Sequence, residues 1–145
     1  MKIFFSASVS RDRSLLPVTQ NIVTQIEDMG HEVVNKHLVD PTYANEPMWD
    51  KKDDPKLFYD NELERLKNAD LLITECTTPS FGAAFFIDHC LEMGKPLLSL
   101  HYGYDDVNKA PIMLRGKQGI NLHFYNEGNL QEKLKIFFNS LKKLV

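Results

Sequence analysis

The sequence has few of the features that mark secreted, membrane-spanning or nucleic-acid-binding proteins. Its 2 cysteines, Cys76 and Cys90, are too few for a disulfide framework, so we expect reduced thiols and a cytoplasmic protein. No apolar run approaches the roughly 20 residues that cross a bilayer. The N-terminus turns polar at Ser6, before the apolar core of a signal peptide could form. Lys and Arg number 17 against 20 Asp and Glu, and a net charge of −3 speaks against nucleic-acid binding.

Several ligand-binding signatures of α/β proteins are also missing. There is no glycine-rich Walker loop and no dinucleotide fingerprint. A phosphorelay receiver needs acidic residues after the first strand, where this chain has Ser6, Ala7 and Ser8. The 5 histidines are scattered without the spacing of metal ligands. We therefore expect no metal and no cofactor, and we interpret Cys76 as a small buried residue.

What remains is an ordinary globular composition in which strand-like and helix-like segments alternate. With 145 residues and 43% hydrophobic residues, we expect one domain, residues 1–145. The strand-like runs are Lys2–Ala7, Glu32–Asn35, Leu71–Thr74, Pro96–Leu100 and Ile120–Phe124. The helix-like segments are Leu16–Met29, Leu57–Ala69, Phe81–Met93 and a last amphipathic one from Leu130 to Leu144. This alternation predicts an α/β fold, a three-layer flavodoxin-like (Rossmann-like) sandwich with five parallel strands in the order 2-1-3-4-5.

The fold class predicts where a ligand would bind. In open parallel sheets, ligands bind beyond the carboxyl ends of the strands, where the strand order reverses. Here the loop 6–14 follows the first strand and the loop 75–82 leads into a helix, whose N-terminus would suit an anion. The hydroxyl groups in these loops could equally serve only as helix caps. The polar stretch Pro41–Pro55, which contains Trp49, is either a lid or an insertion.

Glu62 stands out because it falls on the apolar face of its predicted helix. At about 100° per residue, Glu62 lies about 40° and Leu66 about 80° from Phe58. A carboxylate that faces inward needs a partner or a chemical purpose. The alternative is that Glu62 lies close enough to the helix start to reach solvent or a backbone donor.

The motifs together resemble the nucleoside 2-deoxyribosyltransferase-like family, and within it the 2′-deoxynucleoside 5′-phosphate N-hydrolases. The likeness covers nearly the whole chain and depends on the order and spacing of short segments. These segments are Phe4-Phe5-Ser6-Ala7-Ser8, His37-Leu38-Val39-Asp40-Pro41, residues 69–75, Thr78-Pro79-Ser80-Phe81-Gly82, Gly94-Lys95-Pro96 and Met113-Leu114-Arg115-Gly116.

The resemblance implies a homodimer that cleaves the bond between base and deoxyribose while strand-end loops hold the 5′-phosphate. Ser8 and Ser80 match positions that bind the phosphate, and Val9 and His37 match positions near the base. Glu62 matches an acidic position of the active site. Ser6, Ser10, Gly82 and Met113 complete the expected substrate-binding residues.

Three positions depart from the family pattern. The family's catalytic glutamate corresponds to Phe86, and Asp88, about 200° away around the helix, cannot replace it. Ser10 takes the place of an arginine, whose charge Arg11 or Arg13 could restore. Pro111 takes the place of a serine expected to reach across the dimer.

A phenyl ring cannot attack a sugar carbon or stabilise an oxocarbenium ion, so the function stays open among three alternatives. The chain could be an N-glycosidase in which Glu62, Asp40 or Glu75 supplies the missing charge. It could be a catalytically inactive nucleotide or sugar-phosphate sensor. It could be an interaction domain whose pocket is filled by Phe81, Phe85 and Phe86. The nearly all-apolar helix 81–93 needs burial in any of these cases.

Overall fold

The computed structural model describes residues 1–8, 13–41, 54–103 and 107–143. In chain order the elements are β1 Lys2–Ser6, α1 Leu16–Asp28, β2 Glu32–Val33, the 3-10 turn η1 Lys36–Val39, α3 Pro55–Asn68, β3 Leu71–Glu75, α4 Phe81–Glu92, β4 Leu97–Tyr102, the 3-10 turn η3 Val107–Lys109, α5 Ile112–Gly116, β5 Leu122–Tyr125 and α6 Leu130–Lys142. The stretch 41–55, expected to be a lid or an insertion, lies mostly outside the described residues. In the described part of the chain, no helix is long and apolar enough to cross a membrane.

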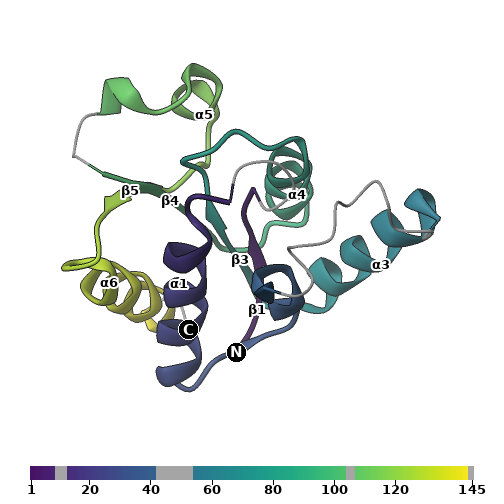
Figure 1. Ribbon diagram of the computed structural model, residues 1–145, viewed down its shortest axis with the longest axis horizontal. Helices are drawn as coiled ribbons and strands as arrows, with labels where there is room; N and C mark the ends of the chain where they lie inside the picture. Colours follow the sequence, from purple (N-terminus) through teal and green to yellow (C-terminus); the bar gives the residue numbers. More distant parts are fainter. Residues whose placement is uncertain (9–12, 42–53, 104–106, 144–145) are drawn as a thin grey trace.

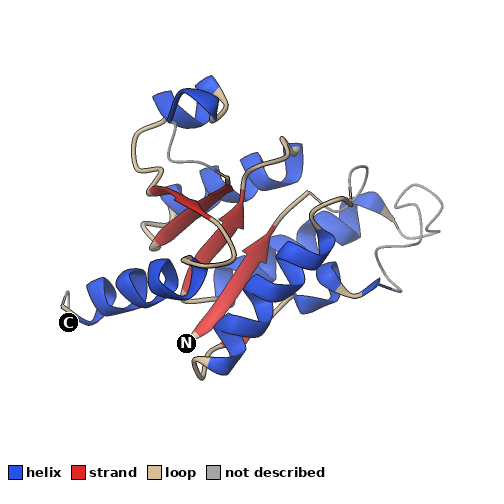
Figure 2. Cartoon of the chain, turned by 60° about the vertical axis from the view of Figure 1, so that its left-hand side comes forward, coloured by secondary structure: helices blue, strands red, loops and turns tan. Residues whose placement is uncertain are grey.

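The five strands form one parallel sheet in the order β2-β1-β3-β4-β5, so the predicted fold class is confirmed. Figures 1 and 2 show the sheet as a middle layer, with helices α1 and α6 side by side on one face and α3 and α4 on the other. The reversal of strand order between β1 and β3 brings the loops after these two strands to the same edge of the sheet.

Each face of the sheet has its own hydrophobic core, because successive strand residues point to opposite faces. The larger core, which we call the α1/α6 core, joins Ile3, Phe5, Ile73 and Leu100 to side chains of α1 and α6. The smaller one, the α3/α4 core, joins Phe4 and Leu72 to α3, α4 and the residues around α5; its buried members are Phe4, Leu66, Ala69, Leu72, Cys76, Ile87, Cys90, Leu97 and Ile120.

The strand and helix boundaries differ from the predicted ones where side chains replace backbone hydrogen bonds. β2 ends at Val33 rather than Asn35 because the Asn35 side chain takes over the pairing with β1. Its Oδ1 accepts from the Phe5 backbone N–H at 2.8 Å, and its Nδ2 donates to the Phe5 carbonyl at 2.6 Å. α3 begins at Pro55 rather than Leu57, since the Asp54 carboxylate accepts from the Lys56 backbone N–H at 2.9 Å and caps the helix.

Candidate functional site

A row of three hydroxyl groups crosses the α3/α4 face of the sheet near the carboxyl ends of its strands. Ser6, Thr74 and Ser99 are cross-strand neighbours in β1, β3 and β4, and all three are buried. They occupy the positions two residues after Phe4, Leu72 and Leu97, so the same face is apolar at one end and polar at the other. Ser99 Oγ has only the Cys76 thiol as a weak polar neighbour and makes no hydrogen bond of its own.

Glu62 lies on the buried side of α3, as its periodicity predicts, and is only 1% exposed. One carboxylate oxygen, Oε1, lies 3.3 Å from His37 Nε2 and also accepts from the guanidinium of Arg65, one helical turn further on. The other oxygen, Oε2, is buried and has no hydrogen-bond partner. Glu62 therefore has one oxygen held in place and one able to accept a hydrogen bond from a ligand hydroxyl or a water molecule.

Phe86, which the sequence resemblance places at the position of the family's catalytic glutamate, packs onto the sheet. Its ring lies 4.8 Å from that of Phe4, tilted by 58°, at the margin of the α3/α4 core. Asp88 points elsewhere: its carboxylate forms an ion pair with Lys117 at 2.6 Å and is half exposed. This placement agrees with the expectation that Asp88 does not replace the family's glutamate, which stays a prediction.

Ser80 caps α4, and its hydroxyl remains able to donate. Ser80 Oγ accepts a hydrogen bond from the Ala83 backbone N–H at 3.3 Å. A hydroxyl that accepts from the helix can still donate its own hydrogen to a ligand oxygen, so capping and anion binding are compatible here. A Cβ atom added at Gly82 would lie 3.7 Å from Ser80 Oγ, an ordinary contact distance. Steric crowding therefore does not require glycine at this position.

The other expected substrate-binding residues are only partly brought together. Ser6 is buried at the end of β1, Ser8 follows it, and His37 follows β2, so these three lie at the carboxyl edge of the sheet. Val9 and Ser10 lie outside the described residues, as do Arg11 and Asp12. Met113 is 82% exposed on α5, so within a single chain its side chain points into solvent.

Glu75 ends β3 but belongs to the opposite face of the sheet from Glu62. Ile73, two residues earlier, and Tyr125, which donates to Glu75 Oε1 at 3.2 Å, are both in the α1/α6 core. Burial raises the pKa of Glu75, against the opposing effect of hydrogen bonds from Thr77 and Tyr125. Glu75 therefore lies on the opposite face of the sheet from Glu62, and its role as a source of the missing charge stays a prediction. Asp40, the other carboxylate named for this role, is exposed at the end of η1.

The two thiols have the character of buried structural groups. Burial raises the pKa of Cys76 to about 11 and that of Cys90 to about 11, so neither is a ready thiolate near neutral pH. The interpretation of Cys76 as a small buried residue is confirmed. In the described part of the chain, no group of three or more histidine, cysteine or acidic side chains could hold a metal ion.

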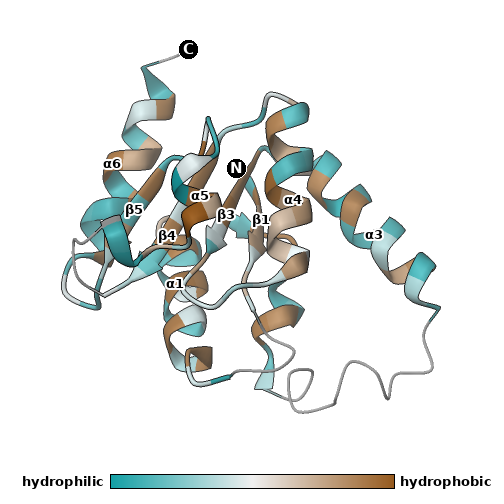
Figure 3. Cartoon of the chain, turned by 90° about the horizontal axis from the view of Figure 1, so that it is seen from above, coloured by the Kyte–Doolittle hydropathy of each residue, from teal (hydrophilic) through white to brown (hydrophobic). Residues whose placement is uncertain are grey.

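Phe81 and Phe85 do not fill a pocket, contrary to the third alternative. They are 87% and 52% exposed on α4, while Ile112 and Met113 are exposed on α5. The Asp88–Lys117 ion pair joins the two helices, with Phe85 one turn before Asp88 and Met113 one turn before Lys117. We call these four side chains the α4–α5 apolar surface; Figure 3 shows the hydrophobic residues on both helices.

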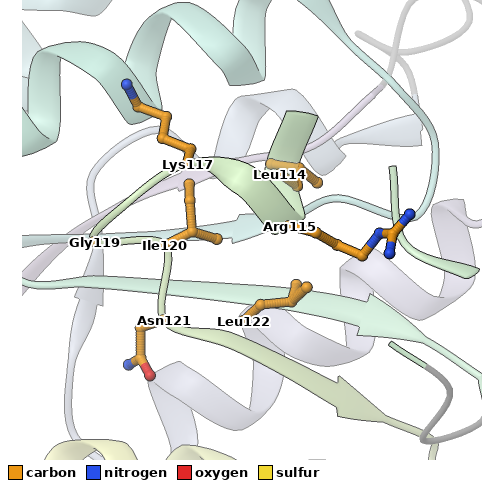
Figure 4. A pocket seen from close by; sticks show the side chains of 7 residues that line it. All are labelled: Leu114, Arg115, Lys117, Gly119, Ile120, Asn121 and Leu122. Carbon is orange, nitrogen blue, oxygen red and sulfur yellow. The ribbon is translucent and has the colours of Figure 1, made fainter. Parts of the chain in front are cut away.

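A hollow of about 530 Å³ lies away from the predicted site (Figure 4). It is lined by α5 and the segment that enters β5, namely Leu114, Arg115, Lys117, Gly119, Ile120, Asn121 and Leu122. Leu122 is the first residue of β5, so this hollow is at the amino end of that strand. Its position excludes it as the ligand site that the sheet topology predicts.

Sequence reasoning missed the residues that surround Glu62 and Glu75. The spacing of Arg65 three positions after Glu62 is a signal for an ion pair on one helix face. The alternation within Phe4-Phe5-Ser6 and Leu72-Ile73-Thr74 could have shown the hydroxyl row. Tyr125 lies 50 residues from Glu75, and no local pattern predicts that pairing.

Comparison with known proteins relates the chain to deoxynucleotide N-hydrolases. It is 27% identical over 135 residues to a Thermofilum pendens protein named as a candidate 2′-deoxynucleoside 5′-phosphate N-hydrolase, covering 93% of this chain and 91% of that one. It is 25% identical over 146 residues to a 5-hydroxymethyl-dUMP N-hydrolase of Danio rerio, covering 99% of each chain. No protein-family model matches the chain.

Solved structures of similar fold come from the same group of activities. The chain superimposes on a CMP N-glycosidase of Clostridium botulinum with a TM-score of 0.63 and 19% identity, covering 94% of this chain and 99% of that one. A 2-deoxyribosyltransferase of Bacillus psychrosaccharolyticus gives a TM-score of 0.61 and 18% identity, covering 89% of this chain and 88% of that one. The resemblance to the nucleoside 2-deoxyribosyltransferase-like family and its N-hydrolases is thus confirmed.

Proposed function

We propose that this relative of the deoxynucleotide N-hydrolases binds a 2′-deoxynucleoside 5′-monophosphate at the carboxyl edge of its sheet without cleaving the N-glycosidic bond. The phosphate would lie between Ser8 and Ser80, at the N-terminus of α4. The base would lie near His37, with Gly82 and Met113 as further contacts; Val9 and Ser10, the other expected contacts, lie outside the described residues. Two observations carry the proposal: the buried Glu62 Oε2 on α3 has no hydrogen-bond partner, and Phe86 on α4 packs on Phe4.

The chemistry of bond cleavage explains why binding and catalysis separate here. Breaking the bond to the base builds positive charge on the sugar, which a carboxylate on the opposite face attacks or stabilises. A phenyl ring offers neither a lone pair nor a negative charge, and loss of such a group costs several kcal/mol of barrier, about 3–4 kcal/mol in comparable sites. Glu62 alone could contribute acid–base assistance of about 10²–10⁴-fold.

The second candidate function is a slow N-hydrolase in which Glu62 activates water. The free Glu62 Oε2 favours it, because a buried carboxylate oxygen without a donor can take a proton from a water molecule. His37 and Arg65 hold the other oxygen, so the carboxylate has a fixed orientation. Under this alternative, Glu62→Gln removes the residual activity and leaves the fold intact.

We also propose that the protein works as a homodimer in the cytoplasm. The α4–α5 apolar surface supports a dimer, because large exposed hydrophobic side chains on adjacent helices often mark protein–protein contacts. Pro111, which replaces the serine expected to cross the dimer, immediately precedes α5. Analytical ultracentrifugation of the wild type and of a Phe81→Asp, Met113→Asp double variant tests this: we expect a dimer for the first and a monomer for the second.

Thermal unfolding with the four common 2′-deoxynucleoside 5′-monophosphates tests binding. A ligand at 100 times its dissociation constant stabilises the folded state by about 2.7 kcal/mol, which raises the Tm by several degrees. Chromatography of the same mixtures for free base separates a binding protein from a hydrolase. No shift with any nucleotide would contradict the proposal.

Restoring the missing carboxylate tests the role of position 86. We expect Phe86→Glu to release free base faster than the wild type, and Phe86→Gln, of similar size but uncharged, not to do so. If Phe86→Glu folds and binds nucleotide but releases no more base, position 86 is not the site of the nucleophile.

A further inference from the structure

Glu75 is a buried carboxyl group that the proposed chemistry does not use. It is 2% exposed at the end of β3, and in the described ranges no lysine, arginine or histidine pairs with it. Isolated carboxyl groups are costly to bury, so one that persists at the ligand edge of a sheet calls for a purpose. Its hydrogen-bond donors indicate what this purpose is.

These donors connect Glu75 to the loop that leads into α4. The Thr77 backbone N–H donates to Glu75 Oε2 at 3.2 Å, and the Thr77 hydroxyl donates to Oε1. The same hydroxyl accepts from the Tyr102 backbone N–H at 2.7 Å, and Tyr125 donates to Oε1 from β5. One carboxyl group therefore joins the ends of β3, β4 and β5 to the turn at Thr77, three residues before the α4 cap at Ser80.

We propose that Glu75 is a positioning residue for the 5′-phosphate: it shapes the turn that presents Ser80 and the start of α4, and it takes up a proton from solvent when the phosphate binds. This inference rests on the proposed function, because it assumes that the phosphate lies at α4. It adds a link between phosphate affinity and pH that the binding proposal does not contain.

The proton uptake follows from the groups that face Glu75. They are the hydroxyls of Thr77 and Tyr125, the Tyr102 phenol behind them and the Cys76 thiol; none of these is a base. Burial raises the pKa of Glu75 before any ligand arrives. A phosphate dianion nearby disfavours a second negative charge, so it raises the pKa of Glu75 further, and binding takes up protons. Affinity for the monophosphate therefore falls as the pH rises through the pKa of Glu75.

Calorimetry with matched nucleotide and nucleoside pairs tests the proposal. Each 2′-deoxynucleoside 5′-monophosphate of the panel and its nucleoside are titrated into the wild type at pH 6 to 8, in two buffers of different ionisation enthalpy. The buffer dependence gives the number of protons taken up. The variants are Glu75→Gln, which keeps an acceptor for Thr77 but cannot titrate, Glu75→Ala, which removes the anchor, and the exposed-site control Glu92→Gln.

For the wild type and Glu92→Gln we expect proton uptake with the monophosphate but not with the nucleoside. In Glu75→Gln this uptake should be lost, and only the proton exchange of the phosphate group itself should remain. Glu75→Ala should weaken monophosphate binding by about tenfold, the equivalent of one pKa unit, and leave nucleoside binding unchanged. The wild-type and Glu75→Gln measurements decide the question even if Glu75→Ala does not fold.

Equal proton uptake by the wild type and Glu75→Gln would overturn the inference and leave the proposed function standing, because nucleotide binding itself would have been measured. An equal loss of nucleoside and monophosphate binding in Glu75→Ala would overturn it as well. If the wild type binds no monophosphate at all, both proposals fail.

Discussion

The two faces of the sheet differ in how completely they are covered and in what they contain. The α1/α6 core has 17 buried members, and α6 alone contributes Leu130, Leu134, Phe137 and Phe138. The α3/α4 core has 9, and α3 buries only Glu62 and Leu66 of its 14 residues. The first face is mainly an apolar core that stabilises the fold, with the Glu75 carboxyl group at its carboxyl edge. The second combines a smaller core with a hydroxyl row and a buried carboxylate, at a cost in stability that a ligand site can justify.

The largest expected effect compares matched leucines on the two faces. Leu134 and Leu66 are both fully buried, on α6 and α3. We expect Leu134→Ala to lower the free energy of unfolding by about 3–5 kcal/mol and Leu66→Ala by about 2–3 kcal/mol, since the more sparsely packed face relaxes around the cavity more easily. Denaturant titration measures both. Ile136→Ala, half exposed on α6, is the control and should stay within about 0.5 kcal/mol of the wild type.

Equal or reversed losses for the two leucines would contradict the idea that the α3/α4 face is the less stabilising one. The result also bears on Glu62, because the helix that carries Glu62 is held mainly by Leu66 and by Lys95. Lys95 Nζ donates to the carbonyls of Leu66, Lys67 and Ala69 at the end of α3.

The second effect separates stability from binding at Glu62. Replacing a buried ion pair with an apolar side chain is often neutral or stabilising by about 1–4 kcal/mol. His37 and Arg65 are partly exposed, so their polar atoms remain hydrated without Glu62. We therefore expect Glu62→Leu to be as stable as the wild type but to bind deoxynucleoside monophosphates at least tenfold more weakly, by about 1.4 kcal/mol.

Glu64→Leu, an exposed position two residues away on the same helix, is the matched control and should bind like the wild type. If Glu62→Leu instead loses more than about 3 kcal/mol of unfolding free energy and keeps its affinity, Glu62 is a structural residue and the site lies elsewhere.

The sequence predicted the fold better than the site, for physical reasons that these residues illustrate. The alternation of strand and helix periods predicted all five strands and their order, because parallel sheets follow local patterns and handedness rules. It did not predict that an Asn35 side chain would complete the pairing of β1, or that residues 112–116 would form a short helix. Those features depend on contacts rather than on periodicity.

Within the site, helix periodicity placed Glu62 correctly because its burial is a local property of α3. The same reasoning went wrong for Phe81 and Phe85, since an apolar helix can leave hydrophobic side chains exposed for a partner. Glu75 was one of three carboxylates expected to supply the missing charge, and the sequence did not show its hydrogen bonds to Thr77 and Tyr125. Its partner Tyr125 comes from β5, the other end of the chain.

The third effect is a pH dependence of the protein's stability, caused by Glu75 at the edge of the α1/α6 core. A carboxyl group with a raised folded-state pKa stabilises the protein below its unfolded pKa, and this contribution is lost as the pH rises through the folded value. We expect the unfolding free energy of the wild type to fall relative to that of Glu75→Gln as the pH rises above about 4.5, by about 1.4 kcal/mol for each unit of raised pKa. Parallel curves for the two proteins would show that Glu75 is ionised as easily in the folded state as in the unfolded one.

The smallest effect is at Ser99, at the β4 end of the hydroxyl row, and it tests whether this polarity costs stability. Ser99 Oγ is fully buried without a hydrogen bond, whereas Thr74 Oγ1 lies 3.7 Å from the Cys76 sulfur and keeps a weak one. Removing an unsatisfied buried hydroxyl recovers part of its desolvation penalty, so Ser99→Ala should raise the free energy of unfolding by about 1 kcal/mol. Thr74→Val, which removes a hydroxyl with a partner, should not be stabilising. If Ser99→Ala is destabilising, the hydroxyl has a bound water as its partner. The hydroxyl row then stabilises the fold instead of lowering its stability.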